Sequence, residues 1–165
     1  MNNKGVSGII ATIIMIALVL VIAGALWATI NNLVGDKISS SESCFGNFGK
    51  VTLNKQFTCK DTVSNEIDFA ISRGDIDLDK ILVSVEGPSG TKSFEITNSS
   101  AYSYVKMYNG AFNGTLQLPD KNAGLTYSVG LVQIGITDAT TIKIAPIING
   151  NQCEVSDSVT SLNSC

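Results

Sequence analysis

Four cysteines carry the most definite chemistry in this chain, Cys44, Cys59, Cys153 and Cys165. No two of them have the Cys-x-x-Cys spacing of a zinc site. In a chain that is exported, an even number of cysteines predicts disulfide bonds, and four cysteines allow three connectivities. We expect the local pairs, Cys44 with Cys59 and Cys153 with Cys165. In the chain-entropy model, closing such a short loop contributes about 3 kcal/mol to stability.

The segment DIDLDKILVSVE has four carboxylates at the spacing of a calcium-binding loop. They are Asp75, Asp77, Asp79 and Glu86, at the first, third, fifth and twelfth positions. The sixth position is Lys80, where the turn of such a loop requires glycine, and ILVSVE has the pattern of a strand rather than of an exit helix. We therefore expect a strand edge whose charges discourage pairing with a further strand, and no metal site.

Catalysis and nucleic-acid binding find little support in the residue types. The chain has no histidine, no glycine-rich phosphate loop and no serine nucleophile elbow. Its one arginine is Arg73, whereas binding to a duplex requires lysine and arginine gathered on one face. Arg73 begins the tripeptide RGD, which we interpret as a turn rather than as an adhesion motif. We expect no enzyme, no cofactor and no nucleic-acid partner.

Two N-glycosylation sequons are present, Asn98-Ser99-Ser100 and Asn113-Gly114-Thr115. Both lie beside predicted turns, where a glycan would have room. Sequons also arise by chance in a chain rich in asparagine and serine, so the occupancy of Asn98 and Asn113 stays open.

The elements that must position these residues divide the chain into two parts. Residues 6–35 contain no ionisable side chain, whereas all 14 acidic residues and ten of the 11 basic residues lie beyond them. Residues 9–30 contain no proline, and a helix of that length rises about 33 Å, enough to cross a bilayer core. Because every backbone polar group in lipid must be bonded internally, we predict a helix there. Trp27, Asn31 and Asn32 lie where the apolar run meets polar sequence, as is typical at a membrane surface.

Three fates are open to this helix. A secretory signal would be cut after AGA at residues 23–25, but the apolar pattern continues through Leu26, Ile30 and Leu33. A plain membrane anchor would keep the helix and hold one domain outside the cell. In the third fate, a short polar leader is removed ahead of the apolar run, and the helix is retained in the mature protein.

The third fate rests on a resemblance. The leader NNKG, in which Lys4 is the only charged side chain, is followed directly by VSGIIATIIMIALVLVIAGAL. This arrangement resembles the prepilin-type (class III) signal of archaeal type IV pilins and archaellins. The resemblance implies that a membrane prepilin peptidase cuts after Gly5 and that Val6 becomes the new N-terminus. Bacterial type IV pilins have a glutamate five residues into the mature chain, and here that residue is Ile10, which favours the archaeal branch.

A helix that is apolar on every side must be buried on every side, in lipid or among copies of itself. Gly8 with Thr12, and Gly24 with Ala28, form small-xxx-small pairs that let helix backbones approach closely. Small residues are also frequent in membrane helices in general, so self-association is a hypothesis. Head-to-tail contacts that do not close into a ring generate a filament.

The rest of the chain has the pattern of β-structure. After the serine-rich SSSES at residues 39–43, the segment EIDFAIS places Ile67, Phe69 and Ile71 on one face, with Glu66 and Asp68 on the other. Further strands are expected at residues 81–86, 93–97, 102–108, 111–118, 125–134 and 141–148, with turns at EGPSG, Asn109-Gly110 and Asn149-Gly150. Seven or eight short strands favour an antiparallel, Ig-like β-sandwich, and hence an α+β chain.

The expected organisation has four parts: a leader at residues 1–5, an apolar helix at 6–38, a linker at 39–48 and a β-sandwich at 49–165. The resemblance implies a pilin, the structural subunit of an archaeal type IV pilus-like surface filament with a role in adhesion. Its precursor would lie in the membrane and meet prepilin peptidase and the pilus assembly machinery. The mature chain would be extracellular, often glycosylated, and would form a helical filament with further copies of itself.

Two alternatives stay open. Within the family, the chain would be a subunit of an archaellum. Outside it, the chain would be a monomeric, membrane-anchored extracellular binding protein, with tyrosines lining an exposed pocket. The tyrosines in question are Tyr102, Tyr104, Tyr108 and Tyr127, and cross-strand packing explains them equally well.

Overall fold

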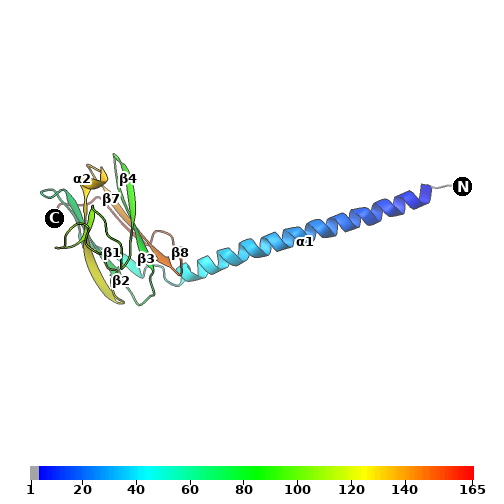
Figure 1. Ribbon diagram of the computed structural model, residues 1–165, viewed down its shortest axis with the longest axis horizontal. Coiled ribbons are helices and arrows are strands. Elements are labelled where there is room, and N and C mark those ends of the chain that lie inside the picture. The colour runs from blue at the N-terminus through cyan, green and yellow to red at the C-terminus, as the bar shows by residue number, and fades with distance from the viewer. Residues whose placement is uncertain (1–3) are drawn as a thin grey trace. The chain divides into compact units, whose positions relative to one another are not determined.

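The computed structural model describes residues 4–165. The chain divides into two compact units, with the boundary between Ser41 and Glu42. Helix α1 (Lys4–Phe45) makes up the first unit and enters the second, which otherwise consists of strands and the short helix α2 (Leu131–Ile134) (Figure 1). The predicted leader at 1–5 lies partly outside the described residues, which begin at Lys4. The α+β fold with an apolar N-terminal helix followed by an antiparallel β-sandwich is confirmed.

Helix α1 extends further than the sequence predicts. It continues past residue 38, through the serine-rich segment, and ends at Phe45. Serine is only moderately unfavourable in a helix, so it does not end one that is already formed. The stop is supplied by the next residues, where Gly46 follows directly and Gly49 adopts a left-handed conformation with φ of 71°. The segment expected to be a linker is therefore helical over most of its length.

Two antiparallel sheets form the second unit. The first sheet has the order β1-β2-β6-β5, and the second has the order β4-β3-β7-β8, with β9 also pairing with β7. The strands of the first sheet are β1 (Val51–Asp61), β2 (Glu66–Arg73), β6 (Ala123–Gly130) and β5 (Val105–Met107). Those of the second are β4 (Gly90–Ile96), β3 (Lys80–Gly87), β7 (Thr141–Ile148), β8 (Asn151–Gln152) and β9 (Asp157–Thr160).

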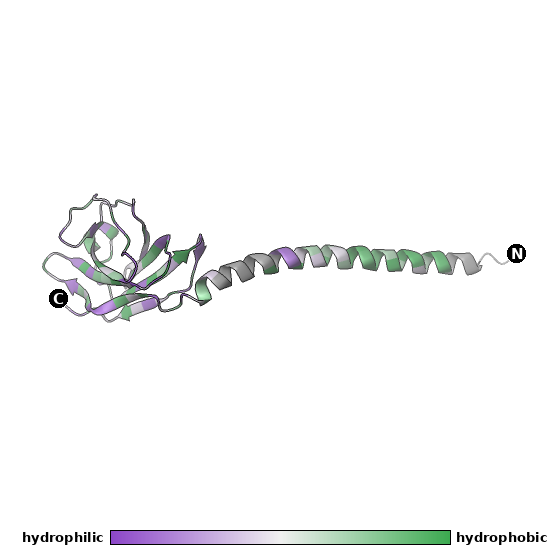
Figure 2. Ribbon diagram, turned by 90° about the horizontal axis from the view of Figure 1, so that it is seen from below, coloured by the Kyte–Doolittle hydropathy of each residue, from purple (hydrophilic) through white to green (hydrophobic). Residues whose placement is uncertain are grey.

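The core lies between the two sheets and follows the alternation of each strand. Ile67, Phe69 and Ile71 of β2 are fully buried, which confirms the predicted inner face. Phe69 stacks on Tyr127 of β6 with ring centroids 5.4 Å apart, and it also contacts Phe94 of β4 in the second sheet. Figure 2 shows this alternation of hydrophobic and hydrophilic residues along the strands, in contrast to the continuous hydrophobic colour along much of α1.

Several strands differ from the prediction. The sequence does not predict the short strands β8 and β9, and the strand expected at 102–108 is only Val105–Met107. It does not predict β1 either, because a bulge between Asn54 and Cys59 interrupts the alternation of β1 with β2. Residues 111–118, expected as a strand, form a loop that buries Leu116 and Leu118. The strand expected at 125–134 ends at Gly130, and its apolar continuation LVQI is the helix α2, which Gly135 ends in a left-handed conformation.

Two of the three predicted turns are confirmed as hairpins. Pro88 and Ser89 connect β3 to β4, with Gly87 opposite Gly90, and Asn149-Gly150 connects β7 to β8 with positive φ at both residues. Asn109-Gly110 is a turn but not a hairpin, because the residues after it form a loop instead of a strand.

Candidate assembly helix and its disulfide anchor

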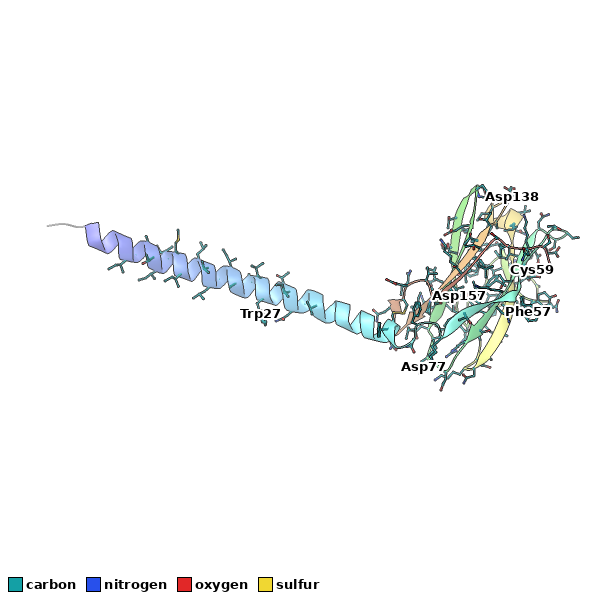
Figure 3. All side chains as sticks on the ribbon, turned by 180° about the vertical axis from the view of Figure 1, so that it is seen from behind. Trp27, Phe57, Cys59, Asp77, Asp138 and Asp157 are labelled. Atoms are coloured by element: carbon teal, nitrogen blue, oxygen red, sulfur yellow. A yellow bond between two sulfur atoms is a disulfide. The ribbon has the colours of Figure 1, made fainter. Side chains whose placement is uncertain are left out.

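The apolar part of α1 is the candidate functional element. Residues 8–32 form a helix that is long and apolar enough to cross a membrane, and every side chain in that range is exposed in the isolated chain. Trp27 lies near its polar end and projects from the helix (Figure 3). A helix of this kind is typical of a membrane-inserted segment or of a secretory signal.

The two threonines of this segment satisfy their hydroxyl groups within the helix. Thr12 Oγ1 donates to the carbonyl of Ile9 at 2.8 Å, and Thr29 Oγ1 donates to the carbonyl of Ala25 at 2.9 Å. Such back-bonding is the usual way in which a hydroxyl is accommodated in apolar surroundings. Neither hydroxyl therefore prevents the helix from being covered by lipid or by another helix.

The predicted packing residues are open to approach. No described atom lies within 4 Å of a Cβ built on Gly8 or on Gly24, apart from the helix's own backbone. Thr12 and Ala28, one turn further along in each pair, are exposed. Close helix contacts at these four residues stay a prediction.

The predicted cleavage site lies at the start of the described helix. Lys4, Gly5 and Val6 have helical backbone, and their side chains lie outside the described residues. Cleavage between Gly5 and Val6 stays a prediction.

Both disulfides connect residues far apart in the sequence, so the predicted local pairing is wrong. Cys44 is bonded to Cys153 and Cys59 to Cys165, with Cα atoms 5.4 Å and 5.1 Å apart. Strand β1 explains the error. Cys59 lies near its far end, and an extended strand advances about 3.3 Å per residue, so Cys44 and Cys59 are too distant for a bond that requires Cα atoms less than about 7 Å apart.

The Cys44–Cys153 bond attaches the end of α1 to the second sheet. Cys44 lies in the last turn of α1, within the second unit, and Cys153 directly follows β8. The peptide chain itself continues from Phe45 into β1 of the first sheet. The last turn of the helix is therefore connected covalently to both sheets, and disulfides of this kind are typical of extracellular domains.

The outer edge of β1 is covered by the C-terminal residues. Leu53 N–H donates to the Asp157 carboxylate at 2.9 Å, and Lys60 N–H donates to the carbonyl of Asn163 at 2.7 Å. Cys165 N–H returns a bond to the carbonyl of Lys60 at 3.1 Å, beside the Cys59–Cys165 disulfide. Figure 3 labels Asp157 and Cys59, which mark the two ends of this contact. The edge is closed against addition of a further strand.

The four carboxylates of the calcium-like segment contact three different partners. Asp77 contacts Lys121 Nζ at 2.9 Å and Asp75 contacts it at 3.7 Å, and the hydrogen bond from Lys121 lowers the pKa of Asp77. Asp79 accepts a hydrogen bond from Gly150 N–H at 2.8 Å. Glu86 pairs with Lys143 at 2.7 Å on the outer face of the second sheet.

The charged residues of the tripeptide RGD make structural contacts within the domain. The Arg73 guanidinium donates to the carbonyl of Ile76 through Nε at 2.9 Å and Nη2 at 2.6 Å, and to the carbonyl of Pro119 through Nη1 at 2.8 Å. Asp75, the third residue of the tripeptide, faces Lys121. Arg73 thus holds two loops together at the end of β2.

Both sequons lie on exposed turns. Asn98 Oδ1 accepts a hydrogen bond from Leu118 N–H at 2.7 Å, which joins the segment after β4 to the loop between β5 and β6. Asn113 has a positive φ of 63°, and its N–H donates to the carbonyl of Tyr102 at 2.8 Å. Glycosylation at either asparagine stays a prediction.

Of the four tyrosines that a binding pocket would use, three lie in the core or pack against it. Tyr127 is fully buried, its hydroxyl donates to the carbonyl of Gln117, and burial raises its pKa. Tyr102 and Tyr104 pack edge-on against Phe94, with centroids 6.0 Å and 5.9 Å away. Only Tyr108 is largely exposed among the four. Of the two explanations, packing accounts for Tyr102, Tyr104 and Tyr127.

One feature that the sequence reasoning missed is the pair Phe45 and Phe48. Both rings are exposed: Phe45 is the last residue of α1, and Phe48 lies in the turn that leads to β1. The signal in the sequence that could have identified this pair is the presence of two phenylalanines just before the first strand. No protein-family model, curated protein or solved structure matches the chain.

Proposed function

We propose that the chain is a structural subunit of a type IV pilus-like surface filament. The observation that carries the proposal is the apolar helix, whose side chains are exposed over residues 8–32 although the attached domain has a complete core of its own. A free chain with this helix is insoluble in water, so the helix requires permanent cover. The β-sandwich would be displayed on the filament surface, where an adhesive contact would form.

Lipid would cover the helix in the precursor, and neighbouring helices would cover it in the filament. The exchange costs little, because the apolar area stays out of water in both surroundings, and the area term of about 25 cal/mol per Å² is kept. The resemblance of the N-terminal segment to a class III signal supports removal of residues 1–5 and retention of the helix. The proposal assigns the chain no catalytic role.

The disulfide between Cys44 and Cys153 supports a structural role. It fastens the last turn of α1 to the folded domain through a second covalent connection. A subunit that is held in an assembly through its helix transmits load at this junction, and two connections distribute the load over both sheets.

Electron microscopy of surface fibres tests the proposal. We expect fibres on the source organism that contain the chain and that disappear when its gene is deleted. A Gly5→Asp variant, which the peptidase should not process, is expected to remove them as well, whereas Asn3→Asp in the leader is the matched control and should keep them. Unchanged fibres after deletion would refute the proposal and favour the monomeric anchored protein.

A further inference from the structure

The end of α1 and the turn that follows it carry two exposed phenylalanines. Residues 43–49 read SCFGNFG, with no charged side chain. Phe45 is 89% exposed and Phe48 is 73% exposed, whereas Phe69 and Phe94 of the second unit lie in its core. Two phenylalanine rings exposed so close together in the sequence mark a surface that is covered in the working protein.

The two rings are presented on a fixed backbone. Asn47 N–H donates to the carbonyl of Cys44 at 3.1 Å, and Asn47 Nδ2 donates to the carbonyl of Ser43 at 2.8 Å. Lys50 N–H then donates to the carbonyl of Asn47 at 3.1 Å, and the disulfide holds Cys44. Only Gly46 and Asn47 separate the two phenylalanines in the sequence. The pair is therefore ordered before any partner arrives, which lowers the entropic cost of a contact.

Phe45 and Phe48 are not expected to be covered by lipid. The segment DKISSSE at residues 36–42 separates the apolar span from Phe45, and it contains Asp36, Lys37 and Glu42. Charged side chains of both signs are costly to bring into a bilayer. The aromatic pair therefore belongs outside the membrane, beyond a polar segment.

The small area of the two phenylalanine side chains favours a partner that is already held nearby. Two phenylalanine side chains bury roughly 300 to 500 Å² when fully covered, whereas a stable independent interface requires about 1,200 to 2,000 Å². A partner that arrives freely from solution would not stay bound to so small a patch. A second copy that is already held through its own helix needs only this additional contact, because its effective concentration is high.

We propose that Phe45 and Phe48 form a contact between the outer domains of neighbouring copies of this chain. The inference rests on the proposed function, because the small patch binds only when the helices have brought the copies together. The contact adds a second layer of packing outside the helical core and sets the spacing of the domains.

Photo-crosslinking in assembled fibres tests this contact. Phe48→p-benzoylphenylalanine keeps an aromatic side chain at the patch and reacts with C–H bonds within reach. The matched control carries the same replacement at Val63, which is 92% exposed in the turn between β1 and β2, at the other end of β1 from Phe48. We expect irradiated fibres to yield covalent dimers for the Phe48 variant, at least ten times more than for the Val63 variant, and no dimers from chains dispersed in detergent.

The outcomes separate the two proposals. Fibres that form without dimers at Phe48, or with adducts to lipid only, overturn the aromatic contact and leave the proposed function intact. Failure of the wild-type chain to form fibres under any assembly condition overturns both. A Phe45→Ser, Phe48→Ser double variant gives a second readout, and we expect its fibres to dissociate at several-fold lower detergent concentration than fibres of Val63→Ser. Equal resistance of the two variants contradicts the contact.

Discussion

Cys44, in the last turn of α1, is bonded to Cys153, which lies 109 residues later and directly after β8. This bond closes nearly the whole β-sandwich into one covalent loop that begins and ends at the helix. The Cys59–Cys165 bond closes a second loop of similar length, offset toward the C-terminus. The domain is therefore constrained at both ends of β1, the strand that connects it to the helix.

Removal of the Cys44–Cys153 bond is expected to destabilise the domain strongly. In the chain-entropy model, a loop of this length contributes about 5 kcal/mol to the free energy of unfolding. The Cys44→Ser, Cys153→Ser variant should therefore unfold at a much lower denaturant concentration in detergent solution. It should also be cut faster by trypsin after Lys50, because the segment from Phe45 to Lys50 loses its anchor.

The Cys59→Ser, Cys165→Ser variant is the matched control for that cut. Its loop separation is 106 residues, so its loss of stability should be similar, while cleavage after Lys50 should stay slow in the folded state. Equal rates of cleavage after Lys50 in the two variants would contradict a specific role of Cys44 at the helix end.

Asp157 is expected to stabilise the edge of β1. Its carboxylate accepts hydrogen bonds from the backbone N–H groups of Leu53 at 2.9 Å and Ser158 at 2.8 Å. Asp157→Ala should lower the free energy of unfolding by about 1 to 3 kcal/mol, because the Leu53 N–H loses a charged acceptor. The control is Asp138→Ala, whose side chain is 77% exposed and pairs with Lys60 at 3.3 Å, and which should change stability by less than about 1 kcal/mol. Equal effects in chemical denaturation would refute this assignment.

Tyr127 should make the domain sensitive to alkaline pH. Burial raises its pKa in the folded state, so the folded protein resists loss of the phenolic proton. The associated stability is present below the unfolded pKa of about 10 and is lost as pH rises above it. Tyr127→Phe should flatten this alkaline loss, and at neutral pH it should cost about 1 kcal/mol because the bond to the Gln117 carbonyl is removed.

The control for Tyr127 is Tyr108→Phe, because the Tyr108 side chain is 53% exposed. Denaturant midpoints measured between pH 8 and pH 12 in the wild-type protein and both variants test the assignment. An unchanged alkaline slope in Tyr127→Phe would show that another group is responsible.

Lys92 is expected to keep the outer domains from pairing through β4. This strand is an edge of the second sheet, and Lys92, which is exposed, lies on the same face of the strand as buried Phe94 and Ile96. Its Nζ lies 5.5 Å from the centroid of the Tyr104 ring. An inward-pointing charge at an edge prevents the addition of another strand.

The Lys92→Val variant should therefore associate through its outer domains, while Lys92→Arg should behave as the wild-type chain does. Light scattering of the full chain in detergent measures the difference. Identical masses for Lys92→Val and the wild-type chain would contradict a protective role for Lys92.

The parts of the fold that could be predicted are those with a local pattern. Strict alternation placed Ile67, Phe69 and Ile71 in the core, and the absence of charge predicted the apolar helix. Strand β1 could not be predicted in this way, because its bulge breaks the two-residue alternation of buried and exposed side chains that identifies a strand. Leu116 and Leu118 show the reverse case, in which alternating residues are buried without a neighbouring strand to pair with.

The disulfide pairing could not be predicted because it depends on topology. Cys59 and Cys165 meet only because the C-terminal residues return along the outer edge of β1, a contact between residues more than 100 positions apart. Local sequence favours short loops, whereas the sandwich brings distant segments together at its edges. The same reason applies to Arg73, whose bond to the carbonyl of Pro119 depends on the neighbouring positions of two loops.

The fate of the apolar helix is tested most directly by mass spectrometry of the chain recovered from isolated surface fibres. We expect an N-terminus at Val6, with the leader removed and residues 8–32 retained in the fibre. An N-terminus at Leu26 would show a cleaved secretory signal, and an intact Met1 would favour a plain anchor. Either result would contradict the claim that the helix is kept in order to be buried among copies of itself.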